Sequence, residues 1–237
     1  MTRRPPLPVA VAQPLIVPHD VGGNAECHAE VVRAAGARVV VFPELSLTGY
    51  ELDAEPVGPD DARLTPLVEA CAATGAVALA GAPVRGEGGS VHIAMLAFDG
   101  DGAAVAYRKM WLGGDETARF TPGPEPAVLE VDGWRLGLAI CKDTGVERHA
   151  LDTATLGIDA YLAGVLEAFD DAHVQPERAR RVRRRHGVWV VVASYAGSAG
   201  GGFDRAAGGS FVLRPDGSLA AAAGFEVGAV VVAELSP

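Results

Sequence analysis

The chain has 237 residues, 49% of them hydrophobic, so it is long enough to bury a sizeable core as one domain over residues 1–237. Its 20 Lys and Arg residues against 30 Asp and Glu residues give a formal net charge of −10, which argues against a nucleic-acid binder or a protein of anionic membranes. Three cysteines are too few for a disulfide framework or a Cys-rich zinc site, and no apolar run is as long as a membrane span, so a soluble cytoplasmic protein is expected.

The first part of the chain is predicted to alternate strands with helices. Short β-branched runs bounded by Pro and Gly predict strands, and apolar residues at helical spacing predict helices. We expect strands over residues 7–13, 37–42 and 76–82, and helices over residues 24–35 and 64–74. Pro43 ends the second of these strands, so Glu44 is predicted to lie just beyond a strand end.

A predicted hairpin and a long connection follow. An Asp-Gly-Asp-Gly sequence is typical of a tight turn, and it joins predicted strands over residues 91–98 and 103–108. Lys109 follows the second strand directly. Residues 110–126, which include Glu116, form a long connection punctuated by Gly and Pro, and a loop of this length inside a domain is usually functional or disordered.

The next predicted strand delivers a cysteine to its end. The run from Trp134 to Ile140 is mostly aliphatic, and the residues after Cys141 are typical of a turn and a helix cap. The thiol is therefore expected at an exposed corner, close to helix N–H groups that favour an anion. The remaining predicted elements are helices over residues 147–156 and 176–186 and strands over residues 158–163, 188–193, 209–213, 219–223 and 228–234. Strands outnumber helices and several form hairpins, which favours an α+β fold with mixed sheets.

Three strand ends carry residues of complementary chemistry: Glu44, Lys109 and Cys141. A carboxylate can take the thiol proton, the thiolate can attack an electrophilic carbon, and an ammonium can stabilise the resulting oxyanion. Taken singly, each residue has an ordinary interpretation, as a turn cap, a surface charge and a buried structural cysteine. The catalytic interpretation requires that the three strand ends meet in space.

The motifs around these residues resemble the nitrilase, or carbon–nitrogen hydrolase, superfamily. They are Val40-Val-Phe-Pro-Glu44, then Tyr107-Arg-Lys109 with Glu116 and Phe120-Thr-Pro-Gly123 after it, then Leu138-Ala-Ile-Cys141-Lys-Asp. Three motifs in this order, with similarity along nearly the whole chain, are a far more specific signal than any one of them. The resemblance implies a four-layer αββα sandwich, which agrees with the hairpin-rich pattern.

The resemblance also implies roles for individual residues. Glu44 would be the general base, Cys141 the nucleophile, and Lys109 the cation beside the tetrahedral intermediate. Glu116 would position Lys109 or the substrate, and the backbone N–H of Lys142 would complete the oxyanion hole. Among the residues near these motifs, Tyr50 is a candidate for lining the substrate pocket, although an aromatic residue after a glycine is about as often packing. No cofactor or metal is implied, and the expected partners are a small amide substrate and further copies of the chain in a homodimer or higher homo-oligomer.

An unperturbed glutamate with a pKa of about 4.3 is a weak base toward a thiol with a pKa of about 8.5. The catalytic interpretation therefore requires burial to raise the pKa of Glu44, or proton transfer concerted with attack.

Departures from the family pattern limit the substrate assignment. Lys142 stands where many relatives carry an aromatic residue, residues 144–146 replace an aromatic-proline pair, and residues 164–169 lack a tryptophan often found there. An amidase or N-carbamoyl amidase acting through a thioester is preferred to a true nitrilase. The alternative is a catalytically silent or weakly active member that binds a small ligand or a protein partner in the same pocket.

Other candidate sites are weaker. The six arginines between Arg178 and Arg185 share one predicted helix, where a solvated or interface face is favoured over nucleic-acid binding. The six histidines show no metal-ligand spacing, and a Cys–His hydrolase using His92 or His149 has no local support. Arg3-Arg4 is followed by three prolines within four residues, which is not typical of a signal peptide.

Overall fold

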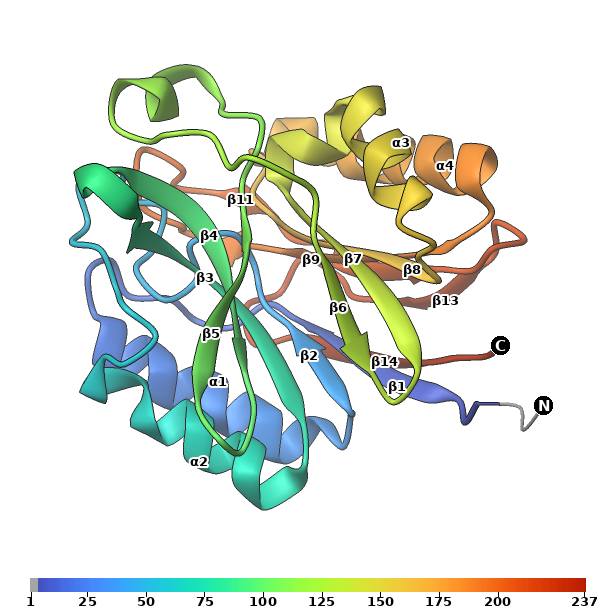
Figure 1. Cartoon of the computed structure of the whole chain (residues 1–237), viewed down its shortest axis with the longest axis horizontal. Helices are drawn as coiled ribbons and strands as arrows, with labels where there is room; N and C mark the ends of the chain where they lie inside the picture. The colour runs from blue at the N-terminus through green and yellow to red at the C-terminus, as the bar shows by residue number, and fades with distance from the viewer. Residues whose placement is uncertain (1–3) are drawn as a thin grey trace.

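The computed structural model describes residues 4–237, so Arg3 of the Arg3-Arg4 pair lies outside the described residues. Two six-stranded sheets form the centre of the molecule, with a pair of helices outside each (Figure 1). The first and last strands, β1 and β14, lie next to each other as antiparallel neighbours (Figure 1).

The first sheet has the strand order β14-β1-β2-β3-β4-β5. Parallel pairing joins β1 to β2 and β2 to β3, and the other neighbours are antiparallel. Its strands are β1 (Leu7–Ala12), β2 (Val39–Val41), β3 (Val77–Arg85), β4 (Val91–Phe98), β5 (Ala103–Arg108) and β14 (Val230–Leu235). Helices α1 (Val21–Ala35) and α2 (Thr65–Thr74) cover its outer face (Figure 1).

The second sheet has the order β13-β12-β9-β8-β7-β6, with parallel pairs β7 to β8 and β8 to β9. Its strands are β6 (Val128–Val131), β7 (Trp134–Ile140), β8 (Ala160–Val165), β9 (Trp189–Ser194), β12 (Phe211–Leu213) and β13 (Leu219–Ala222). Helices α3 (Glu147–Thr155) and α4 (Val174–His186) cover it, and β10 (Ala196–Gly197) pairs with β11 (Ala206–Ala207). The 3-10 turns are η1 (Ala62–Leu64), η2 (Glu87–Gly89), η3 (Gly114–Ala118), η4 (Cys141–Gly145) and η5 (Phe169–Asp171).

Three of the four apolar clusters among the described residues define the four layers. The largest joins the two sheets and includes Val9 and Val41 from one sheet and Leu136 and Leu162 from the other. The second packs α1 and α2 on the first sheet, and the third packs α3 and α4 on the second sheet. The central strands therefore bury side chains on both faces, which explains why they are continuous apolar runs. The predicted αββα sandwich is confirmed.

Several element boundaries differ from those predicted. Helix α1 begins at Val21 rather than Asn24, because the Asp20 carboxylate accepts from the Gly23 N–H at 3.0 Å and caps a turn whose glycines disfavour a helix. Strand β2 has three residues instead of the expected six. The long connection over residues 110–126 is not continuous loop, since it contains η3, and β6, a strand that was not predicted, follows it. No helix within residues 4–237 is both long and apolar enough to cross a bilayer.

Candidate active site

Charged residues from three segments meet in the interior. Glu44 follows β2, Lys109 follows β5, and Glu116 lies in η3. The Lys109 Nζ donates to Glu44 Oε1 at 2.6 Å and to Glu116 Oε1 at 2.7 Å. The side chains of Glu44, Lys109 and Glu116 are 0%, 1% and 2% exposed, so this is a buried cluster of two carboxylates and one ammonium.

Glycines let the Glu44 loop sit between the two sheets. A Cβ on Gly81 in β3 would lie 2.2 Å from the Leu45 amide nitrogen, and one on Gly164 in β8 would lie 2.6 Å from the Phe42 carbonyl oxygen. Because no side chain fits at either position, each sheet approaches the backbone on one side of Glu44. This close approach places the carboxylate at the junction of the sheets.

Cys141 occupies a strained corner at the end of β7. Its φ of 43° is unusual for a residue with a side chain, and such strain persists only where the surroundings hold it. The Thr144 Oγ1 donates to the Cys141 carbonyl oxygen at 2.7 Å, and the Cys141 Sγ donates to the Leu166 carbonyl oxygen at 3.2 Å. The predicted strand-to-helix corner is confirmed, with the 3-10 turn η4 between strand and helix, but Cys141 is half-buried there rather than exposed as expected.

A series of buried hydrogen bonds holds the Cys141 corner against β5, the strand that ends just before Lys109. Asp143 Oδ2 accepts from the Ile140 N–H at 3.0 Å and from the Tyr107 hydroxyl at 2.8 Å, and its Oδ1 accepts from the Trp111 N–H at 2.9 Å. The Tyr107 oxygen lies 2.8 Å from His149 Nε2. Because this carboxylate bonds both to the residue before Cys141 and to the segment after Lys109, it fixes the Cys141 corner relative to the segment that carries Lys109.

The roles of Asp143, Tyr107 and His149 were not found from the sequence. The available signal was their position, since Tyr107 and Asp143 each stand two residues from a predicted catalytic residue, inside the same motifs. The suggested Cys–His pairing has no support in the described structure. His149 bonds to Tyr107 and Tyr161, and His92 lies at hydrogen-bonding distance from Ser90 and Thr121.

Burial dominates the electrostatics of Glu44 and raises its pKa from 4.5 to about 7. Lys109 opposes this shift, and the negative charge of Glu116 adds to it. For Lys109 itself, burial lowers the pKa, but Glu44, Cys141 and Glu116 outweigh that effect and hold the ammonium charged. Burial also raises the pKa of Glu116, yet the pairing with Lys109 keeps it below its ordinary value. Glu116 therefore stays ionised while Glu44 is poised to exchange a proton near neutral pH.

The thiol and the poised carboxylate are electrostatically coupled. Burial and the Glu44 charge raise the pKa of Cys141 well above its usual value, against the opposing effect of Lys109. The thiol in turn lowers the pKa of Glu44. Glu44 Oε2 is buried and has no hydrogen-bond partner within residues 4–237. One oxygen of Glu44 is thus held by Lys109, and the other is free to take a proton.

The two residues assigned to substrate binding have different surroundings. The Tyr50 hydroxyl donates to Glu116 Oε1 at 2.7 Å, so Tyr50 joins the charged cluster and also packs edge-on against Phe203 at 5.2 Å. The Lys142 side chain is exposed and donates from Nζ to the Leu112 carbonyl oxygen at 2.6 Å. Its backbone N–H lies in the first turn of η4, next to the thiol.

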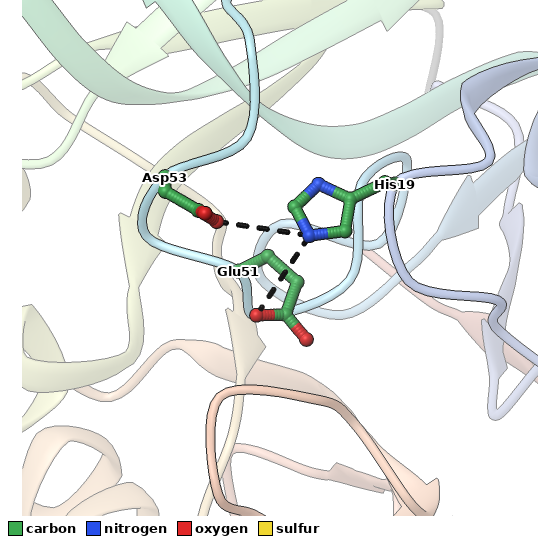
Figure 2. A group of neighbouring side chains, drawn as sticks. All are labelled: His19, Glu51 and Asp53. Atoms are coloured by element: carbon green, nitrogen blue, oxygen red, sulfur yellow. Dashed lines mark ion pairs between the residues drawn. The ribbon is translucent and has the colours of Figure 1, made fainter.

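The remaining charged groups lie outside this cluster. Four of the six α4 arginines have defined partners: Arg178 pairs with Glu167, Arg181 and Arg185 with Glu147, and Arg183 bonds to a backbone carbonyl. Figure 2 shows His19 between Glu51 and Asp53, an arrangement that sequence spacing did not indicate. The His19 Nε2 lies 4.0 Å from Glu51 Oε2 and 3.7 Å from Asp53 Oδ1, and the cluster faces solvent, where ion pairs contribute about 1 kcal/mol at most.

Comparison with known proteins shows the family to which the chain belongs. Residues 8–237 match the Carbon-nitrogen hydrolase family, and the chain belongs to it. It is 29% identical over 226 residues to the Pseudomonas protegens protein called "Hydrolase in pqqF 5′region", covering 90% of this chain and 78% of that protein.

Two solved structures share the fold. A mutant of the Nesterenkonia AN1 amidase, from the nitrilase superfamily, superposes with a TM-score of 0.86 at 25% identity, over 97% of this chain and 90% of that one. Saccharomyces cerevisiae Nit3, a nitrilase-superfamily member, gives a TM-score of 0.86 at 22% identity over 98% and 90% of the two chains.

Proposed function

We propose that the protein is an amidohydrolase that cleaves the C–N bond of a small linear amide or N-carbamoyl compound through a thioester on Cys141. The observation that carries this proposal is the buried Glu44–Lys109–Glu116 cluster beside the thiol. Its carboxylate with a pKa of about 7 is matched to proton exchange at neutral pH.

The first half-reaction forms the thioester. As the Cys141 sulfur attacks the amide carbon, its proton passes to Glu44, and the carbonyl oxygen becomes an oxyanion beside the Lys109 ammonium and the Lys142 N–H. Glu44 then gives the proton to the leaving nitrogen, so ammonia or an amine departs. Because the thiol pKa exceeds that of Glu44, proton transfer is coupled to attack rather than preceding it.

The second half-reaction hydrolyses the thioester. Glu44, now a carboxylate again, takes a proton from water as the water oxygen attacks the acyl carbon. The Lys109 ammonium and the Lys142 N–H stabilise the second oxyanion. The carbon–sulfur bond breaks, the acid leaves, and the proton on Glu44 returns to the sulfur. Glu116 and Tyr50 touch the ammonium cluster rather than the sulfur, so they hold Lys109 in place.

The solved amidase relatives support this assignment. One mutant of the Nesterenkonia AN1 amidase shows the Michael addition of acrylamide at its active-site cysteine. Another shows covalent addition of the acetamide moiety of fluoroacetamide at that cysteine. These adducts, formed in proteins of the same fold, support a small amide as the reactant at Cys141.

A substrate panel tests the proposal. Purified protein is incubated with short amides and N-carbamoyl amino acids, ammonia release is measured, and adducts are located by intact mass. Cys141→Ala should abolish release and adduct, whereas Cys27→Ala, a second thiol on α1, should change neither. If no substrate releases ammonia and no adduct forms on Cys141, the amidohydrolase proposal is wrong, and the silent ligand-binding alternative replaces it.

A further inference from the structure

Glu167 lies beside the nucleophile and has no part in the mechanism above. The Cys141 Sγ donates to the carbonyl oxygen of Leu166, and Glu167 is the next residue, just past the end of β8. Strands β7 and β8 are parallel, with Ile140 paired to Gly164, so both chains leave the sheet at one edge. The topology therefore brings the Glu167 carboxylate to the rim that holds the thiol.

The Glu167 side chain is fixed through one oxygen only. Its Oε1 accepts from Gln175 Nε2 at 2.8 Å and from Arg178 Nη1 at 3.1 Å. Gln175 is anchored in turn, because its own Oε1 lies 2.9 Å from Thr144 Oγ1, whose single proton it shares with the Cys141 carbonyl oxygen. Glu167 Oε2 accepts no hydrogen bond from the part of the chain that the structure describes, and the side chain is 17% exposed. One oxygen is thus left for a donor that enters from outside.

The charge of Glu167 reaches the reacting groups. It raises the pKa of Cys141, and Lys109 in turn lowers the pKa of Glu167. Burial raises the pKa of Glu167 above its ordinary value and Asp171 adds to that effect, while Gln175, Arg178 and Lys109 offset it only in part. Together with the Glu44 and Glu116 carboxylates, this makes the surroundings of the thiol rich in negative charge, with Lys109 already committed to its two partners.

We propose that Glu167 selects the substrate by charge, favouring short amides whose non-reacting end carries an ammonium group and disfavouring those that end in a carboxylate. This inference rests on the proposed amidohydrolase function. Arg178 offsets part of the Glu167 charge, but it binds Oε1 from α4 and leaves Oε2 open. An ammonium next to Oε2 would donate a charge-assisted hydrogen bond to it. A carboxylate there would be repelled by the negative charge of Glu167.

Two thiol reagents of opposite charge test the proposed charge selection without any catalytic turnover. Wild type and Glu167→Gln are labelled with ethylammonium and ethylsulfonate methanethiosulfonates, and modification of Cys141 is timed by peptide mass. Glutamine keeps an oxygen for Gln175 and Arg178 while removing the charge. The cation-to-anion rate ratio should fall roughly tenfold, as expected for one partly buried charge a few ångströms away. Glu177→Gln, an equal charge change on the exposed surface of α4, should leave the ratio unchanged.

Turnover gives the second measurement. The kcat/KM values of β-alaninamide, its neutral isostere butyramide and the anionic succinamate are compared. Wild type should prefer β-alaninamide, and Glu167→Gln should lose that preference while still hydrolysing butyramide. An unchanged labelling ratio, or an equal slowing of all reagents with a lower Tm, would overturn charge selection in favour of a purely bracing role. Absence of hydrolysis for every amide would instead overturn the proposed function, so the two failures are distinguishable.

Discussion

The pH dependence of kcat/KM tests the central feature of the site, a Glu44 carboxyl with a pKa of about 7. Only the carboxylate can accept the thiol proton, so the reactive fraction falls as the pH drops below that value. One pH unit below a pKa leaves roughly a tenth of the group ionised. We therefore expect kcat/KM at about pH 5 to be about a hundredfold below its plateau, with a slope of one on a logarithmic plot. The assay is the initial rate of ammonia release from a short amide.

A variant of Glu116 sharpens the test. Its negative charge raises the pKa of Glu44, so Glu116→Gln should move the acidic limb of the profile to lower pH. Glu87→Gln, a comparable change in η2 outside the cluster, should leave the limb in place. An inflection near the ordinary glutamate value of 4.5 in the wild type would refute the reasoning, because it would mean that burial does not control the base.

Four further outcomes follow from the same contacts. Because the folded-state pKa of Glu44 is raised, stability should fall as the pH rises from 4.5 to about 7, by about 3 kcal/mol, and Glu44→Gln should remove that decline in urea unfolding. Lys109→Met removes the ammonium that pairs with two buried carboxylates and should lower the free energy of unfolding by about 3–5 kcal/mol. An unchanged Tm near neutral pH would contradict this. Tyr107→Phe removes one of the hydrogen bonds to the buried Asp143 and leaves the buried His149 Nε2 without its partner, so about 1–3 kcal/mol should be lost together with kcat. Gly164→Ala forces a Cβ to within 2.6 Å of a backbone carbonyl and should lower both Tm and activity, whereas Gly114→Ala, with open space around it, should do neither.

Local features of this protein were well predicted from the sequence. The apolar runs of the central strands specify buried strands because their side-chain spacing and β-branching act over a few residues. The turn after Cys141 is likewise encoded by its neighbours. The order of three short motifs was sufficient to indicate the family, and residues 8–237 match it. Boundaries were less accurate, as at α1, where the Asp20 cap outweighs the low helix propensity of the glycines after it.

The meeting of the charged groups was decided by the tertiary structure alone. Glu44 and Lys109 are 65 residues apart, and their contact depends on the strand order of one sheet and on glycines that admit the Glu44 loop between the sheets. The pKa of Glu44 is raised because that contact lies in the buried interior. The hydrogen bonds of Asp143 and the position of Glu167 beside the thiol likewise join segments that are distant in the sequence. Residue types and local periodicity are properties of neighbours along the chain, whereas desolvation and charge coupling arise only when distant segments exclude water together.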